Sequence, residues 1–175
     1  MDDMVHLIEP MIPALRRYAR ALLRDRSAAD DLVQDCLERA IGRWHQRRPG
    51  GDPRTWAFTI LHNLALTRLQ RMARRPPQIA IEDADERQLG RAAPQEDGLR
   101  YRELLTALSQ LPEEQRTVLL LVSVEELSYL ETAKVLDIPV GTVMSRLSRA
   151  RDRLLRLMAG EAQPERIRPQ LRRVT

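Results

Sequence analysis

The stretch Ser128–Met158, SYLETAKVLDIPVGTVMSRLSRARDRLLRLM, predicts two helices joined by a tight turn. Asp137 tolerates a left-handed backbone, and the residue before Pro139 is displaced from the helical region, so the first helix is expected to end there. Thr142 lies near the start of the second helix, where its hydroxyl is expected to cap free amides. The apolar face of the first helix is predicted to comprise Leu130, Ala133 and Leu136.

The second helix of this stretch separates an apolar stripe from a polar face when it is advanced by about 100° per residue. The stripe holds Val143, Leu147, Ala150, Leu154 and Leu157. The polar face holds Ser145, Ser148, Arg149, Asp152 and Arg156, flanked by Arg146, Arg151 and Arg153. A helix-turn-helix protein offers such a second helix to the major groove, where arginines pair with guanine edges or phosphates. The stretch therefore favours DNA binding, and a solvated arginine-rich surface helix is the alternative.

Length and composition limit the class of protein. The 175 residues suffice for one or two small domains, and with 3% aromatic residues and seven glycines they favour packed helices over sheets. The net charge of +4 is only mildly basic, so local basic patches matter more than the total. No stretch approaches the roughly 20 apolar residues that span a bilayer, and the acidic N-terminus is unlike a signal peptide. We expect a cytoplasmic protein without membrane insertion.

The sequence offers little for catalysis. Cys36 is the single cysteine, so it forms neither an internal disulfide nor a multi-cysteine metal site. It is expected in the core, with a redox switch as the alternative. The three histidines are scattered, and the sequence shows neither the paired carboxylates of a catalytic cleft nor a phosphate-binding glycine loop. We therefore predict no catalytic residues, no metal, no cofactor and no enzymatic activity.

Three helices are predicted in the N-terminal half. The first carries the apolar residues Leu15, Tyr18, Ala19, Leu22 and Leu23. Ser27 and Asp30 resemble a capping box for the second. That helix is expected to bury Leu32, Cys36, Leu37, Ala40, Ile41 and Trp44. Asp52 and Pro53 start the third, which is expected to reach about Met72. Its predicted inward residues are Trp56, Ala57, Ile60, Leu61 and Leu64.

Two polar patches on these helices exceed structural needs. The second helix opens with an acidic patch made of Asp30, Asp31, Gln34 and Asp35. Acids favour a helix N-terminus, but three carboxylates and a glutamine are also suited to a basic partner helix. The third helix places Thr59, His62 and Asn63 on more polar faces. It ends in a basic strip that includes Arg68, Arg71, Arg74 and Arg75, which suits both the helix dipole and phosphate groups.

The rest of the chain is divided by a linker. Residues 76–98 contain adjacent prolines and a run of acids with little apolar periodicity, which indicates a flexible acidic linker. Helices are then expected over residues 99–109, from Leu111 onward, and through the helix-turn-helix, before a polar tail. The predicted fold is all-α, with two small helical domains joined by a flexible linker.

Both halves together resemble a bacterial RNA polymerase sigma factor of the extracytoplasmic-function (ECF) group, in the sigma-70 family. RSAADDLVQDCLERA and DPRTWAFTILHNLALTRLQR resemble region 2 of that family. LPEEQRTVLLLVSVEELSYLETAKVLDIPVGTVMSRLSRARDRL resembles its region 4, which contains the helix-turn-helix. The resemblance implies region 2 at residues 1–75, a linker at 76–98, region 4 at 99–160 and a basic tail at 161–175.

The resemblance implies a dissociable promoter-specificity subunit with several partners. Asp31, Gln34 and Asp35, with neighbouring Asp30, match the positions that dock on the β′ clamp helices of core RNA polymerase. The −10 element is expected to be read by the loop at residues 43–52 and by Thr59, His62, Asn63, Arg71, Arg74 and Arg75. The −35 element is expected to be read by Thr142, Ser145, Arg146, Ser148, Arg149, Arg153 and Arg156. Region 4 is also expected on the β flap, and an anti-sigma factor is the expected inhibitor.

The chain departs from the family pattern at a few positions. Glu126 and Asp137 stand where glycine is common, and Met144 stands where a basic residue is common. Ala57 replaces a larger apolar residue and Thr67 an acid. Two other functions remain open: a sigma-like mimic that titrates an anti-sigma factor, and a plain helix-turn-helix regulator. The retained arginines of the second helix favour a promoter-binding sigma factor over a mimic.

Overall fold

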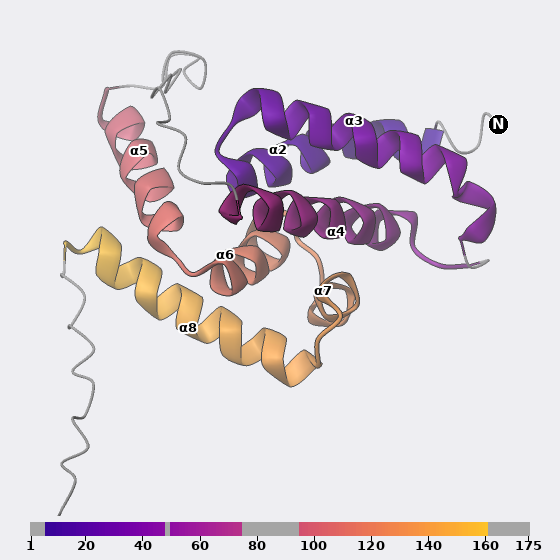
Figure 1. The fold of residues 1–175 in the computed structure, drawn as a ribbon. Coiled ribbons are helices and arrows are strands. Elements are labelled where there is room, and N and C mark those ends of the chain that lie inside the picture. Colours follow the sequence, from indigo (N-terminus) through magenta and orange to yellow (C-terminus); the bar gives the residue numbers. More distant parts are fainter. Residues whose placement is uncertain (1–5, 48–49, 75–94, 161–175) are drawn as a thin grey trace, which may run out of the picture.

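The computed structural model describes residues 6–47, 50–74 and 95–160, and the regular structure within these ranges is helical, with no strand. The all-α prediction is confirmed. In chain order the helices are α2 (Ile12–Leu23), α3 (Arg26–Gly42), α4 (Pro53–Ala73), α5 (Gln95–Gln110), α6 (Glu113–Leu119), α7 (Tyr129–Leu136) and α8 (Val140–Met158) (Figure 1). Short 3₁₀ turns lie at Glu9–Met11 and Trp44–Gln46, and a π-helix at Leu120–Val124 continues α6.

The N-terminal half is a bundle of α2, α3 and α4. All five apolar residues predicted for α2 are buried. Tyr18 of α2 meets Phe58 of α4 edge to face, with ring centroids 5.5 Å apart, a geometry that aromatic pairs prefer. Cys36 of α3 lies in the same core, with its sulfur 3.6 Å from the Ala57 carbonyl oxygen. Cys36 is fully buried, which confirms the core interpretation. Burial raises the pKa of its thiol to about 12, so little reactive thiolate forms.

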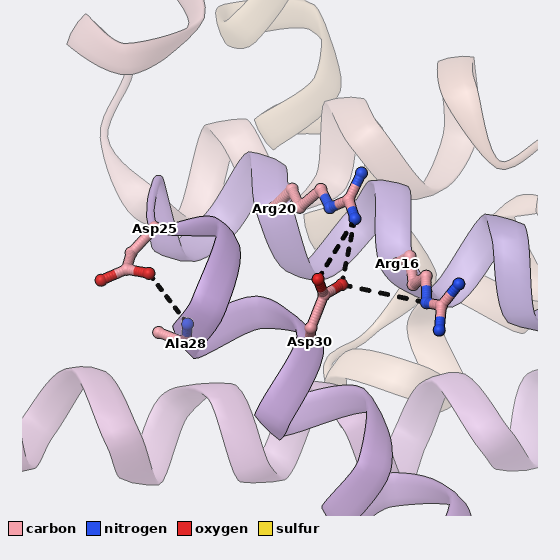
Figure 2. A network of polar contacts seen from close by, with 5 residues as sticks. All are labelled: Arg16, Arg20, Asp25, Ala28 and Asp30. Carbon is pink, nitrogen blue, oxygen red and sulfur yellow. Dashed lines mark hydrogen bonds and ion pairs between the residues drawn. The ribbon is translucent and has the colours of Figure 1, made fainter. Parts of the chain in front are cut away.

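An aspartate caps the start of both α3 and α4. At α4, Asp52 accepts hydrogen bonds from the main-chain N–H groups of Arg54 and Thr55, and Pro53 occupies the first helical position, as predicted. At α3 the predicted capping box is wrong. The cap is Asp25, whose carboxylate accepts from the N–H of Ala28 (Figure 2). Because Asp25 already satisfies this amide, Ser27 lies inside the helix.

In the C-terminal half, α7 and α8 form the predicted helix-turn-helix. Asp137 ends α7 with φ of 52°, in the left-handed region, as predicted. Thr142 does not cap α8. That helix begins one residue after Pro139, and the N–H of Thr142 donates to the Pro139 carbonyl instead. The start of α7 carries a capping box that was not predicted, in which Ser128 and Glu131 each accept the other's main-chain N–H.

The predicted stripe of α8 faces the core. Val143, Leu147 and Ala150 are buried against α6 and α7, with Leu154 and Leu157 half-buried. Two other predicted core positions are wrong: Leu130 in the first turn of α7 is 64% exposed, and Ile41 in the last turn of α3 is 53% exposed. Both residues lie at helix ends. There the apolar spacing of the sequence continues beyond the part of the helix that a neighbouring helix covers.

The two halves pack directly on each other. α7 packs against α4 (Figure 1). Four residues of the C-terminal half, Leu120, Leu121, Leu127 and Val135, are buried in the same apolar cluster as Tyr18 and Phe58. The helix α5 begins at Gln95, earlier than the predicted start at Leu99, and residues 75–94, most of the predicted linker, lie outside the described residues.

Candidate nucleic-acid interface

The polar face of α8 points away from the core that holds the helix. Its five predicted members, Ser145, Ser148, Arg149, Asp152 and Arg156, are all exposed. Arg149 folds back on the preceding turn: its Nε lies 3.2 Å from the Ser145 carbonyl oxygen and its Nη2 lies 3.3 Å from the Ser145 hydroxyl. These hydrogen bonds are long and exposed to solvent, and a phosphate oxygen would offer the guanidinium a stronger acceptor than either serine oxygen.

Three predicted members of the −35 set lie at the border of this face. The Arg146 guanidinium forms an ion pair of 2.8 Å with Glu114 of α6, so it joins α8 to its supporting helix. Arg153 is half-buried, and its Nε is shielded from solvent without a hydrogen-bond partner. Thr142 is half-buried. The members of the −35 set best placed for DNA contact are therefore Ser145, Ser148, Arg149 and Arg156 on the outward face.

The predicted −10 residues are distributed along α4. Asn63 and the basic residues Arg71 and Arg74 are exposed, whereas Thr59 is half-buried and its hydroxyl donates to the Thr55 carbonyl. Arg75 lies outside the described residues. The exposed amide of Asn63 followed by exposed arginines is the combination that a single strand requires, namely polar groups for base edges and cations for the backbone.

His62 was predicted on a polar face, and this prediction is wrong. Its side chain is 6% exposed, and its Nδ1 lies 3.1 Å from the Tyr18 hydroxyl oxygen. Burial lowers the pKa of His62 to about 4 and raises that of the Tyr18 phenol. His62 is thus a neutral core residue that satisfies a buried tyrosine, and it offers nothing to a nucleic acid.

The acidic patch of α3 divides into one residue that pairs with another helix and three that face outward. Asp30 accepts from Arg20 at 3.0 Å and lies 3.8 Å from Arg16, so it ties α3 to α2 (Figure 2). Asp31 and Asp35 are exposed, and the Gln34 amide donates to Glu38 one turn later. Asp31 also lies 3.8 Å from Arg68 of α4, a weak surface contact. The patch open to a partner is therefore Asp31, Gln34 and Asp35.

Some residues that position this interface were not predicted from the sequence. The capping box at Ser128 and Glu131 has the S-x-x-E signature that could have found it. Glu114 and Glu125 carry no local signal, because their arginine partners come from other helices. Within the described ranges, no three His, Cys, Asp or Glu residues gather as a metal ion would require, and no helix has the length and apolar character to cross a membrane.

Both halves of the chain are similar in sequence to known proteins. Residues 8–62 match the Sigma2 domain of PhyR, and residues 101–154 match sigma-70 region 4. The ECF RNA polymerase sigma factor EcfG of Rhodopseudomonas palustris is 36% identical over 150 residues, which cover 84% of this chain and 80% of that protein. The ECF RNA polymerase sigma factor SigC of Mycobacterium tuberculosis is 33% identical over 154 residues, 83% of this chain and 76% of that one.

Solved structures give the same result. The sigma factor RpoE of Bartonella quintana, solved in complex with the anti-sigma factor NepR, superposes with a TM-score of 0.74 at 29% identity, covering 93% of this chain and all of that one. CnrH, solved in complex with the cytosolic domain of CnrY, gives a TM-score of 0.68 at 25% identity, covering 91% and 89% of the two chains. With both halves matched in order along most of its length, the chain belongs to the ECF group of RNA polymerase sigma factors.

Proposed function

We propose that this chain is an alternative sigma factor that binds core RNA polymerase, recognises the −35 and −10 elements of its promoters and starts transcription of a regulon. The observation that carries the proposal is the outward face of α8, where Ser145, Ser148 and Arg149 are exposed on a helix whose opposite side is buried. Region 2 function is assigned to residues 1–75 and region 4 function to 99–160, joined by 76–98. A cytoplasmic location is part of this proposal.

Core docking is assigned to the outward part of the acidic patch. Asp31, Gln34 and Asp35 lie exposed on α3, on the side opposite its buried residues. A row of carboxylates on a rigid helix is suited to the β′ clamp helices, and charge complementarity would speed their encounter. Asp30 acts indirectly, because its pairs with Arg16 and Arg20 hold α3 in place.

Reading of the opened −10 element is assigned to α4. Asn63 presents an exposed amide, and Arg71 and Arg74 follow on the same helix. An amide can both donate to and accept from a base edge, and the arginines can follow the phosphates. His62 is excluded because it is buried.

An anti-sigma factor is the proposed regulator. The solved relative RpoE was captured with the anti-sigma factor NepR, and CnrH was captured with the cytosolic domain of CnrY. The similarity of this chain to RpoE covers 93% of its length, which supports an inhibitor of this kind.

A sigma-like mimic is the second candidate. The N-terminal half matches the Sigma2 domain of PhyR, a protein named an anti-anti-sigma factor in its complex with NepR. A mimic needs the surface that an anti-sigma factor binds, but it has no use for an exposed arginine on a recognition helix. Arg149 and Arg156 favour the promoter-binding function over the mimic.

Run-off transcription with purified core polymerase on a genomic promoter pool tests the proposal. We expect specific transcripts from the wild-type chain. Asp31→Asn with Asp35→Asn should reduce binding to core polymerase, while changing the free energy of unfolding by only about 0.5 kcal/mol, as for other surface positions. Arg39→Ala, at an exposed site on the same helix, is the matched control. A chain that binds an anti-sigma factor but directs no transcription would be a mimic.

A further inference from the structure

A bidentate ion pair joins the two halves of the molecule. Arg17 of α2 donates from Nε to Oε1 of Glu125 at 2.8 Å and from Nη2 to Oε2 at 2.7 Å. Glu125 follows the π-helix of the other half and is 1% exposed, while Arg17 is 53% exposed. The Glu125 carboxylate raises the pKa of Arg17. Parallel fork-to-carboxylate bonds of this length are the strong form of the charged hydrogen bond.

Two further arginines of the N-terminal half bind main-chain oxygens across the same contact. Arg54 of α4 donates to the Glu125 carbonyl at 2.5 Å, and Arg24 after α2 donates to the Ser109 carbonyl at the end of α5. Glu125 is therefore held at both its side chain and its main chain, by two different helices of the partner half. The Glu114–Arg146 pair, by contrast, lies inside the C-terminal half.

The position of Glu125 makes its charge sensitive to separation of the halves. A carboxylate shielded from water is costly unless it is paired, so the closed arrangement depends on Arg17. When the halves separate, water replaces the arginine and the carboxylate is solvated again. The contact is thus stable when complete and has little to support it when half-formed.

The closed arrangement cannot serve both promoter elements, a point that rests on the proposed function. The −35 and −10 elements lie about 25 base pairs apart, which is about 85 Å at 3.4 Å per pair. A compact chain of this length has a radius of gyration of about 16 Å. With α7 packed on α4, the face of α8 and Asn63 belong to one such compact body. The halves must separate before both elements can be bound.

We propose that the Arg17–Glu125 pair is a lock that holds the free sigma factor closed, and that breaking this pair opens the chain and exposes it to core polymerase. The lock sets the fraction of open molecules. Because only open molecules bind productively, the apparent dissociation constant for core polymerase scales inversely with that fraction.

Distance measurement between spin labels on the two halves tests the lock. Labels are attached at Arg39→Cys on α3 and Ala159→Cys after α8, both at exposed positions, while buried Cys36 stays unlabelled. Glu125→Gln and Arg17→Gln should each raise the ratio of long to short distances about tenfold. Glu114→Gln removes a carboxylate of the same charge from a pair within one half, and it should leave the distances as in wild type.

Binding to core polymerase supplies the second readout. Both lock variants should bind about tenfold more tightly than wild type, and the Glu114→Gln control should not. Unchanged distances in both lock variants, or an equal shift in the control, would overturn the lock. If Glu125→Gln fails to fold, Arg17→Gln decides alone, because its side chain is half exposed. If no variant, wild type included, binds core polymerase, the proposed function fails while the distances still decide the lock.

Discussion

At the scale of single residues, the core of the N-terminal half contains one polar pair in an apolar surrounding. The Tyr18 hydroxyl and the His62 ring satisfy each other at 3.1 Å, next to the buried Phe58 ring. A buried polar group without a partner costs free energy, so each side chain makes the other tolerable. The pair also makes the stability of this half dependent on pH.

His62 should destabilise the fold as the solution becomes acidic. Its pKa is lowered to about 4, below the usual value of 6.5, so the unfolded chain binds a proton that the folded chain refuses. The contribution is fully present above pH 6.5 and is lost as the pH falls towards 4. Between pH 7 and pH 5 the loss is about 2 kcal/mol. Urea unfolding of wild type and His62→Gln at both pH values measures it; a loss of equal size in the variant would assign the effect to other groups.

Two exposed arginines of α8 should behave differently on DNA. Arg149 lies beside Ser145 and Ser148 near the start of the helix, where side chains of a recognition helix meet base edges. Arg149→Ala should relax the preference at one −35 position by about 1–3 kcal/mol. Arg156→Ala, nearer the helix end, should weaken binding to all −35 sequences alike. It should also reduce the slope of log binding constant against log salt concentration by about 0.9. A randomised −35 library selected at two salt concentrations measures both. Unchanged base preferences in Arg149→Ala would refute the assignment of this face.

At the scale of helices, periodicity predicted the elements well and their neighbours poorly. It placed α2 and the stripe of α8, because each buries a continuous face along most of its length. On α4 it missed Phe58, Ala65 and His62, because α2, α3 and α7 all contact this helix and cover a wider arc than one partner would. α7, which contacts α4, belongs to the other half of the chain, and no local sequence pattern predicts this contact.

Of the candidate interface, the sequence predicted the outward face of α8 and the exposed part of the acidic patch. It could not distinguish the arginines that face solvent from those that pair with a neighbouring helix. Arg146 and Arg149 are alike in sequence, but only the first has Glu114 of α6 within 2.8 Å. Such a distinction depends on a neighbouring helix, so it becomes visible only in the folded chain.

The capping box of α7 should contribute measurably to stability. Ser128 accepts from the Glu131 N–H, and the Glu131 carboxylate accepts from the Ser128 N–H at 2.7 Å. α7 has only eight residues, so it depends strongly on its end contacts. Ser128→Ala should lower the free energy of unfolding by about 1 kcal/mol. Ser27→Ala, at the serine that does not cap α3, is the control and should change it by less than about 0.5 kcal/mol. Equal losses in both would contradict the assignment.

At the scale of the whole molecule, the two halves share one apolar cluster. Leu121 and Leu127 of the C-terminal half are buried beside Tyr18 and Phe58. Full burial of a leucine is worth roughly 2 kcal/mol, so separation of the halves exposes surface that a partner must cover. The two halves each have their own helices, and they pack on each other through this cluster.

Proteolysis should show whether packing holds the two halves together once the chain between them is cut. A single cut between residues 75 and 94 should leave two helical fragments that still elute together, because their shared cluster and the Arg17–Glu125 pair remain. Glu125→Gln in the cut chain should promote their separation, because it removes the buried carboxylate that Arg17 binds. Size-exclusion chromatography measures both. Fragments of the wild-type chain that separate at low salt would show that the halves do not associate.

The number of residues in the π-helix at Leu120–Val124 determines whether Glu125 faces Arg17. The N–H of Glu125 donates to the Leu120 carbonyl five residues back, so this turn holds one residue more than an α-helical turn would. Deleting exposed Ser123 would let α6 continue regularly and rotate every later residue by about 100°. Glu125 would then point away from Arg17 although both side chains were still present. Homologous chains that differ by one residue here would therefore differ in whether they close.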